Sequence, residues 1–403
     1  MPRKPKTIPI EPEQDEIETT EPETKPVSQR VSSVSDSPKA TVVKSAAPNA
    51  KSGKPNWIWW VVAGVIVIGA VLALGWKLFG APDTTTTKNT NTTNTNTVVQ
   101  NLVPRALDGV LVKGDAANTN IQAVMIENEL TSRPPSGLDH ASVVYEALAE
   151  GGITRFMGLF PVGGDHLAQI GPVRSARPYF VNWAEEYKAL YTHAGGSPQA
   201  LTYLQSGKAN VVDFNQFSHG GNFIRDDSRA APHNLYTNSD LLYNGLRNTV
   251  LRNATPTFTP WTFKDETPLD GRPEAVKDIT INFSSFSYKV TYKYDRGQNR
   301  YVRYLADKPH ITRDGSQIYA KDVVVLFEKT TVLPNDHQRL DITTTGTGKL
   351  LMFRDGTVTE GTWSKESKAR RTEFLGADGK VLPLNPGAIW VEVVPTDRTV
   401  TYQ

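Results

Sequence analysis

The sequence predicts an α+β protein: an α/β-like first outer domain and a mainly β second domain, preceded by one transmembrane helix. Three observations support this. An uncharged apolar run occupies residues 57–76, strand and helix signals alternate over residues 104–265, and short alternating runs separated by Asp-Gly pairs follow over residues 266–403. Strands alternating with helices indicate a layered α/β domain, whereas regular short strands with tight turns indicate a sandwich or barrel.

The apolar run WIWWVVAGVIVIGAVLALGW predicts a membrane-spanning helix with bounds at residues 57–79. At about 1.5 Å per residue, its uncharged part spans about 30 Å, the thickness of a bilayer's hydrocarbon core. Tryptophans at both ends are typical of an interfacial aromatic belt. A cleavable signal peptide is the alternative, but 56 residues precede the run and no A-x-A site follows it closely.

The charges around this run predict its orientation. Residues 40–56 hold no acidic residue, and four lysines lie just before the run: Lys39, Lys44, Lys51 and Lys54. The positive-inside rule therefore places the N-terminus in the cytoplasm and residues 80–403 outside the membrane. The chain has no cysteine, so we expect neither disulfides nor attachment through a lipidated cysteine.

The two segments that flank the predicted membrane span have compositions that do not favour a packed core. Residues 1–56 are rich in Pro, Ser, Thr, Glu and Lys, which predicts a disordered cytoplasmic tail. Residues 80–103 are a Thr/Asn-rich linker between the membrane and the outer region. The net charge of +2 is too small to indicate nucleic-acid binding, and we expect none.

The first outer domain, residues 104–265, carries predicted strands at residues 123–128, 142–148, 153–162 and 189–194. Ser197-Pro198 is a typical N-cap and first turn of a helix that Gly207 ends. Further helices are predicted from about Ser175 and from about Ser239. In the second domain, residues 266–403, strands are predicted at residues 279–283, 288–295, 322–329, 350–356 and 389–395, with Asp-Gly turns among them.

Glycines, arginines and histidines gather in EGGITRF (150–156), GPVRSAR (171–177), HAGGSPQA (193–200) and RAAPHNLY (229–236). We expect these clusters to be loops at strand ends, where α/β sheets place ligand-handling groups. Arginine suits planar capture of phosphate or carboxylate, and glycine lets a backbone approach closely. The sequence therefore predicts an anion-binding site, with ligand-binding candidates Arg155, Arg174, Arg177, Gly195, Gly196, Ser197, Arg225 and Asn234.

The same residues have plainer interpretations. The arginines can form structural ion pairs with Glu146, Glu150 or Asp139, and Ser197 can simply cap a helix. Proton transfer is open to three further candidates, which are Glu150, His193 and His233. The histidine spacing does not favour a metal site, and no phosphate-loop or dinucleotide motif occurs, so we expect neither metal nor cofactor.

The clusters resemble a known family. The segments PPSGLDHASVVYEALAEGGITRF (134–156), IGPVRSARPYF (170–180), HAGGSPQAL (193–201) and APHNLY (231–236) resemble the first domain of the DUF3048 family, and LNPGAIWVEVVP (384–395) resembles its second domain. The resemblance covers nearly all of residues 104–403. It implies a secreted or surface-anchored two-domain protein without an established activity. Lipoprotein members attach through a lipid-modified cysteine, whereas this chain has a predicted membrane helix.

We therefore expect binding of an anionic envelope component, such as a cell-wall polymer or a lipid-linked sugar phosphate. An envelope enzyme, whether a phosphoryl or glycopolymer transferase or a hydrolase, stays open as an alternative. Its layout of tail, single helix and outer domain is similar to that of LytR-CpsA-Psr transferases, although their arginine and aspartate motif is not reproduced here. A third alternative is a structural module whose β domain engages a protein partner.

Overall fold

The computed structural model describes residues 101–254, 256–274, 278–334 and 336–403. The predicted tail, the predicted membrane span and most of the predicted linker lie outside these described residues. Within the described ranges, every helix is too short or too polar to cross a membrane. The described residues belong to one compact unit, Thr95–Gln403.

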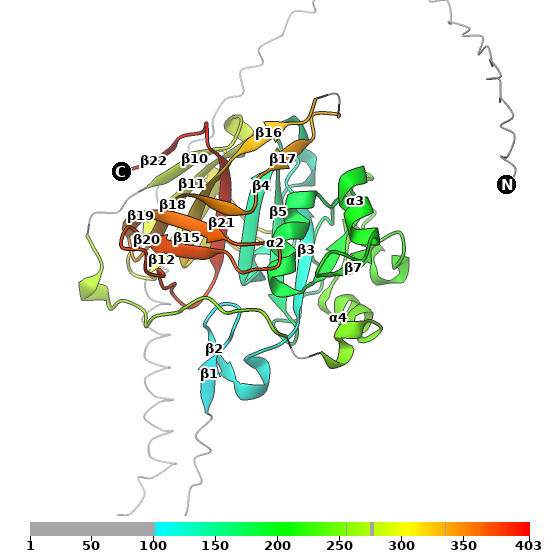
Figure 1. Cartoon of the computed structure of the whole chain (residues 1–403), viewed down its shortest axis with the longest axis horizontal. Helices are drawn as coiled ribbons and strands as arrows, with labels where there is room; N and C mark the ends of the chain where they lie inside the picture. Colours follow the sequence, from blue (N-terminus) through cyan, green and yellow to red (C-terminus); the bar gives the residue numbers. More distant parts are fainter. Residues whose placement is uncertain (1–100, 255, 275–277, 335) are drawn as a thin grey trace, which may run out of the picture. The chain divides into compact units, whose positions relative to one another are not determined.

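A ten-stranded mixed sheet forms the centre of this unit (Figure 1). Its strand order is β20-β19-β18-β15-β21-β4-β5-β3-β6-β7. The earlier half of the sequence supplies β3 (Ile121–Glu127), β4 (Val143–Leu148), β5 (Thr154–Pro161), β6 (Leu190–His193) and β7 (Val212–Asn215). The later half supplies β15 (Asp322–Glu328), β18 (Gly346–Arg354), β19 (Thr357–Lys365), β20 (Glu373–Gly376) and β21 (Ile389–Pro395).

A second sheet of six strands has the order β13-β12-β11-β10-β22, with β14 paired to β12. Its strands are β10 (Ile279–Asn282), β11 (Lys289–Asp295), β12 (Arg300–Leu305), β13 (Lys308–Pro309), β14 (Tyr319–Ala320) and β22 (Val400–Tyr402). Three two-stranded ribbons complete the sheets: β1 (Leu102–Pro104) with β2 (Leu111–Lys113), β8 (Ile224–Arg225) with β9 (Leu235–Tyr236), and β16 (Thr330–Val332) with β17 (Leu340–Ile342).

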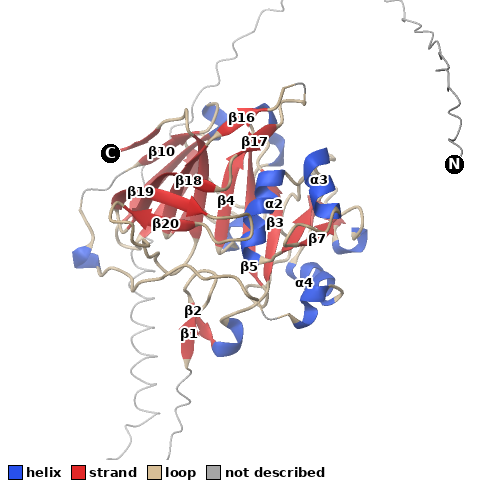
Figure 2. Ribbon diagram, in the orientation of Figure 1, coloured by secondary structure: helices blue, strands red, loops and turns tan. Residues whose placement is uncertain are grey.

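The α-helices all come from the earlier half of the described chain (Figure 2). They are α2 (Pro178–Ala184), α3 (Pro198–Gln205) and α4 (Ser239–Arg247). Single-turn 3-10 helices connect the larger elements at Gly114–Ala116, Leu130–Ser132, Leu138–His140, Glu150–Gly152, Glu185–Tyr187, Gly220–Asn222, Val250–Asn253, Leu269–Gly271 and Phe286–Tyr288. The predicted mixture of helix and sheet is confirmed, and sheet is the larger part.

Hydrophobic cores lie on both faces of the ten-stranded sheet, because its central strands are buried on both sides. On one face, Trp183 of α2 and Leu204 of α3 pack with Tyr145 of β4. On the other face, Leu242 of α4 packs in the same cluster as Tyr292 of the six-stranded sheet. Three layers result: helices, the large sheet, and the smaller sheet with α4.

The ten-stranded sheet contains strands from both sides of the domain boundary that was predicted near residue 265. β21 of the later half pairs in parallel with β4 of the earlier half, in the register Ile389↔Val143 to Val393↔Ala147. The strands predicted to form a separate sandwich or barrel are therefore shared between two sheets. Apart from one glutamate each, VVYEAL and IWVEVV are apolar on both faces, and such strands favour a central position covered on both sides.

Strand directions define one edge of the large sheet. β3, β6 and β7 run parallel to one another, and β5 lies antiparallel between β3 and β4. β3, β4, β6 and β7 therefore end at the same edge, called the carboxyl edge below. Open sheets with parallel strands characteristically bind ligands at such an edge.

Candidate functional site

The carboxyl edge collects the residues that the glycine, arginine and histidine clusters predicted. Glu150 lies in the turn after β4, and Arg155 is the second residue of β5. His193 ends β6, and Gly195 and Gly196 follow after Ala194. The segment containing Arg174 joins the same edge through a backbone hydrogen bond of 3.0 Å, in which the Ala194 amide donates to the Arg174 carbonyl.

Arg174 is oriented by a buried carboxylate. Its Nε lies 2.7 Å from Oε1 of Glu127, the last residue of β3, which is 5% exposed. The other oxygen of Glu127 lies 3.0 Å from Nδ1 of His233. Within the described part of the chain, the terminal nitrogens of Arg174 make no hydrogen bond. One carboxylate therefore aligns the guanidinium and leaves its outer donors available.

Arg155 and Arg177 form a separate cluster around Glu150. Arg177 makes a bidentate contact with this carboxylate, with Nη2 2.6 Å from Oε2, and Nη2 of Arg155 lies 4.0 Å away. Burial and the charge of Arg177 lower the pKa of Arg155 to about 10. Burial alone would raise the pKa of Glu150, but hydrogen bonding and charge from Arg177 hold it below its usual value. The expected structural pairing through Glu150 thus occurs at this cluster.

The helix predicted near Ser175 begins three residues later, at Pro178. Arg177 precedes it with extended backbone, φ −134° and ψ 150°. The residue before a proline is disfavoured in the helical region, so the helix starts at the proline itself. The guanidinium of Arg177 contacts the carboxylate of Glu150 and the carbonyl of Ala176.

A pocket of about 430 Å³ opens at the carboxyl edge. Its charged lining residues are Arg174 and Arg225. Its other lining residues include Gly195, Gly196, Asn215 and Phe217. We call it the arginine pocket. Nη1 of Arg225 donates to Oδ1 of the buried Asn234 at 2.7 Å. The pocket therefore holds two oriented cations in a volume suited to a small ligand.

Backbone geometry shapes the mouth of the arginine pocket. Gly195 has φ +64°, and a Cβ there would lie 3.1 Å from a ring carbon of Phe217. Phe217 is 78% exposed. The amide of Gly195 donates to Oδ1 of Asn215 at 3.1 Å, so this amide is not free to bind an anion. Glycine is required here because the conformation and the aromatic ring both exclude a side chain.

His193 and Ser197 contribute to the framework around the pocket. The His193 side chain is fully buried, with Nε2 2.7 Å from Oδ1 of Asp213 and Nδ1 2.7 Å from the Gly195 carbonyl. Ser197 caps α3, because its Oγ accepts from the Ala200 amide at 3.3 Å. The predicted N-cap is therefore confirmed, and both side chains support the loop that carries Gly195.

Another hollow, of about 390 Å³, lies at the opposite edge of the sheet. Histidine–aspartate pairs mark it: Nδ1 of His140 lies 2.7 Å from Asp165, and Nε2 of His166 lies 3.0 Å from Asp240. The sequence clusters did not indicate this hollow. Each histidine of the hollow faces an aspartate, and the lining residue Arg105 is paired with Asp108, so the charge of the hollow favours no particular ligand class.

A fully buried ionic network connects the two sheets. Arg303 of β12 contacts Glu146 of β4, and its Nε lies 3.1 Å from the Tyr292 hydroxyl and 3.8 Å from Glu392 of β21. Burial and the charge of Glu146 raise the pKa of Glu392 well above its usual value. Sequence reasoning missed this network, although a glutamate inside each apolar run, VVYEAL and IWVEVV, was a signal for it.

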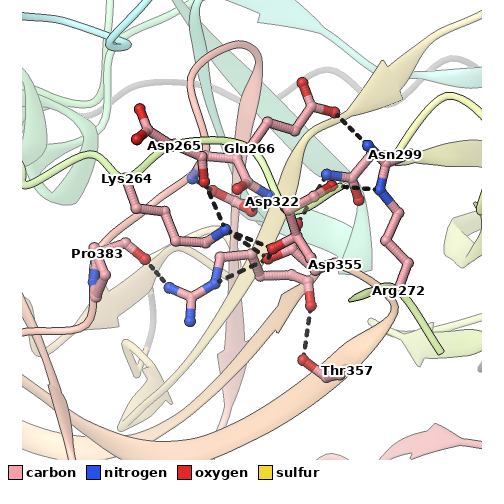
Figure 3. A network of polar contacts seen from close by, with 12 residues as sticks. Lys264, Asp265, Glu266, Arg272, Asn299, Asp322, Asp355, Thr357 and Pro383 are labelled. Atoms are coloured by element: carbon pink, nitrogen blue, oxygen red, sulfur yellow. Dashed lines mark hydrogen bonds and ion pairs between the residues drawn. The ribbon is translucent and has the colours of Figure 1, made fainter. Parts of the chain in front are cut away.

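A second polar network fastens the segment between the two halves of the chain (Figure 3). Nζ of Lys264 lies 2.8 Å from Asp355, in the turn after β18. Nδ2 of Asn385 donates to Asp355 at 2.9 Å and to Asp322 at 3.1 Å. Burial raises the pKa of Asp322 to about 8. Among the residues that the structure describes, Oδ1 of Asn385 finds no hydrogen-bond partner, but the carboxylates of Asp322 and Asp355 are held by donors within the network. We therefore assign the network a structural role.

The fold and the edge pocket together define an α+β protein whose two sequence halves share one sheet. Residues 107–252 match the family described as "Protein of unknown function (DUF3048) N-terminal domain", and residues 279–391 match its C-terminal domain. The chain therefore belongs to the DUF3048 family, as the resemblance predicted.

One relative and one solved structure support this placement. The chain is 32% identical over 276 residues to the "Putative lipoprotein YerB" of Bacillus subtilis (strain 168), covering 68% of this chain and 80% of that relative. A crystal structure of the YerB protein from Bacillus subtilis superimposes with a TM-score of 0.65 at 29% identity. The match covers 75% of this chain and 99% of that chain.

Proposed function

We propose that the protein binds an anionic ligand of the cell envelope through the arginine pocket. The observation that carries the proposal is that both charged lining residues of this pocket, Arg174 and Arg225, are cations. Each is held by a buried acceptor, Glu127 for the first and Asn234 for the second. Arginines pre-oriented in this way lose little freedom when they bind a phosphate or carboxylate.

The ligand is proposed to join an anionic group to a less polar ring. The two guanidinium groups suit a phosphate, and the exposed ring of Phe217 offers an apolar surface beside them. Aromatic rings at the mouth of a site commonly pack on the apolar face of a sugar. A sugar phosphate or the repeat of a cell-wall polymer combines these features.

Two observations support a position of residues 80–403 outside the membrane. The positive-inside pattern around residues 57–79 favours an outer position for residues 80–403. The Bacillus subtilis relative is named as a lipoprotein, a class attached to the outer face of a membrane. Protease treatment of intact cells tests this: digestion of residues 101–403 only after the membrane is opened would contradict the outer position.

Binding is favoured over catalysis because the three candidate proton-transfer groups are engaged in the framework. Glu150 is paired with Arg177, His193 lies between Asp213 and a carbonyl, and His233 pairs with Glu127. The arginine pocket is lined by Arg174 and Arg225 and by none of these three groups. A general acid or base has to reach the reacting atoms of its substrate.

Calorimetric titration with pyrophosphate tests the proposal. We expect salt-sensitive binding that Arg174→Gln and Arg225→Gln each weaken by about tenfold or more, since a charge-assisted hydrogen bond contributes about 1.5–3 kcal/mol. Arg247→Gln is the matched control, because Arg247 is exposed on α4 and does not line the pocket. Equal affinities in all three variants would remove the proposal.

A further inference from the structure

A second groove, of about 610 Å³, lies in the later half of the chain. It runs between β15 and β18 of the large sheet and β22 of the smaller sheet, and Phe327, Leu351 and Tyr402 form part of its floor. We call it the threonine groove. It is separate from the arginine pocket, with which it shares no lining residue.

Cations line this groove without a matching carboxylate among its lining residues. They are Lys329, Lys349 and Arg398. Lys349 lies 3.6 Å from Glu360, but both side chains are more than half exposed, so solvent weakens the pair. Arg398 lies 3.9 Å from the exposed Asp397, and Lys329 forms no ion pair within the described ranges. The groove therefore carries positive charge that the protein does not neutralise.

Hydroxyl groups line the same groove at close intervals. They belong to Thr343, Thr345, Thr347, Thr396 and Thr399. Among the residues that the structure describes, these five side chains find no hydrogen-bond partner. Thr343, Thr345 and Thr347 share a face because residues two apart in an extended segment do so, whereas Thr396 and Thr399 lie in the turn between β21 and β22. Each hydroxyl can donate and accept, which suits a ligand that carries many hydroxyls of its own.

We propose that the threonine groove binds an acidic glycan, a chain of sugars bearing carboxylate or phosphate groups. The lysines and Arg398 meet the anionic groups, and the threonines exchange hydrogen bonds with sugar hydroxyls. Phe327 and Tyr402 offer apolar surface to the rings. A purely inorganic polyanion would use the cations alone, and a neutral glycan would use the hydroxyls alone.

The proposal goes beyond the arginine pocket and does not depend on it. Titration of the whole chain with oligogalacturonate and with a phosphorylated maltooligosaccharide separates the two sources of negative charge, and binding of either supports the proposal. Maltohexaose tests sugar hydroxyls without anions, and tripolyphosphate tests anions without sugar. All four probes are titrated into the Arg174→Gln/Arg225→Gln chain, so that the arginine pocket does not contribute to the binding measured. We expect maltohexaose and tripolyphosphate to bind this chain at least tenfold more weakly than the better acidic glycan.

Substitutions of residues that line the threonine groove test whether the acidic glycan binds there. Lys329→Gln and Lys349→Gln are expected to weaken acidic-glycan binding about tenfold each, whereas Lys380→Gln, at an exposed turn lysine outside the groove, leaves it unchanged. Thr345→Val with Thr347→Val should weaken glycan binding and leave tripolyphosphate binding unchanged. All of these side chains are partly or fully exposed, so folding is expected to persist.

Four results would overturn the proposal. These are equal binding of maltohexaose, tripolyphosphate binding as tight as that of the acidic glycans, unchanged glycan affinity in the lysine variants, and the absence of acidic-glycan binding. Arg174→Gln keeps the two sites distinguishable. It should weaken pyrophosphate binding while glycan binding at the threonine groove persists.

Discussion

Nε of Arg174 lies 2.7 Å from Oε1 of Glu127, so the last residue of a buried strand directs the main cation of the arginine pocket. Glu127 lies opposite Arg155 in the backbone register of β3 and β5, and its other oxygen accepts from His233. The central sheet and the pocket are therefore coupled through one carboxylate. Substitutions at this position separate its orienting role from its charge.

Glu127→Gln should tighten pyrophosphate binding several-fold and lower stability. Glutamine keeps an oxygen for Nε of Arg174 but removes a negative charge close to the bound anion. The free energy of unfolding should fall by about 1–3 kcal/mol, because two charge-assisted hydrogen bonds are weakened. Calorimetry and urea unfolding measure the two effects. Glu129→Gln is the control, since Glu129 lies 4.0 Å from His233 and does not contact Arg174. Weaker pyrophosphate binding in the folded E127Q variant would contradict this prediction.

Gly195→Ala should destabilise the protein by about 1–2 kcal/mol from left-handed strain and crowding. The added methyl group would lie 3.1 Å from the Phe217 ring and displace it from the pocket mouth. Gly207→Ala is a matched control, because Gly207 has φ +68° with open space around its Cβ position. Pyrophosphate affinity should fall only in G195A. If both variants bind equally well, Phe217 has no part in the site.

Arg303→Met should destabilise the protein by about 3–5 kcal/mol, because Glu146 is left fully buried without its ion-pair partner. Adding Glu146→Gln to this variant should recover part of the loss by removing the uncompensated charge. Arg300→Met on the same strand should cost less than about 1 kcal/mol, since Arg300 is a third exposed and lies 3.4 Å from Asp295. Urea unfolding measures all three. A cost at position 303 no greater than at 300 would show that the network is not held as described.

Asp355→Asn should cost more stability at pH 7 than at pH 3. Burial alone would raise the pKa of Asp355, but Lys264, Asn299 and Asn385 lower it to about 2 from its ordinary 3.8. A lowered pKa stabilises the folded state above the unfolded value, and this contribution is lost as pH falls from about 4 towards 2. Allowing for solvent screening, it amounts to about 1–2 kcal/mol.

Asparagine suits this position because Asp355 has φ +53°, and asparagine tolerates left-handed backbone. The side-chain NH2 group of asparagine would face a donor on either side, at both pH values. The change in the stability loss between pH 7 and pH 3 therefore reports the charge. Asp378→Asn, at an exposed Asp-Gly turn, should change stability little at either pH. Equal losses at pH 7 and pH 3 in D355N would rule out the electrostatic explanation.

Local structure could be predicted from the sequence where a single residue, or a short repeat of apolar residues, determines the backbone conformation. The strand predicted at residues 123–128 is β3, and Ser197 caps α3. Asp355-Gly356 forms the turn between β18 and β19 with both residues at positive φ. Pairing between distant strands did not follow, because a run of apolar residues does not specify its partner. The β21–β4 contact is the clearest case.

The candidate site was predicted in part. Arg174, Arg225 and the two glycines of HAGGSPQA do line one pocket. Arg155 and Arg177 do not, because Glu150 holds them in a neighbouring ion-pair cluster. Phe217 and Glu127 were missed, since a single aromatic after β7 and a glutamate ending β3 form no motif. Only the common direction of β3, β6 and β7 brings them together.

The central claim is that Arg174 and Arg225 together hold an anion. A crystal structure of the chain soaked in selenate, with the anion located by anomalous scattering, tests it most directly. The account predicts selenate oxygens within about 3 Å of guanidinium nitrogens of both arginines. Selenate bound elsewhere while the arginine pocket holds only water would contradict it.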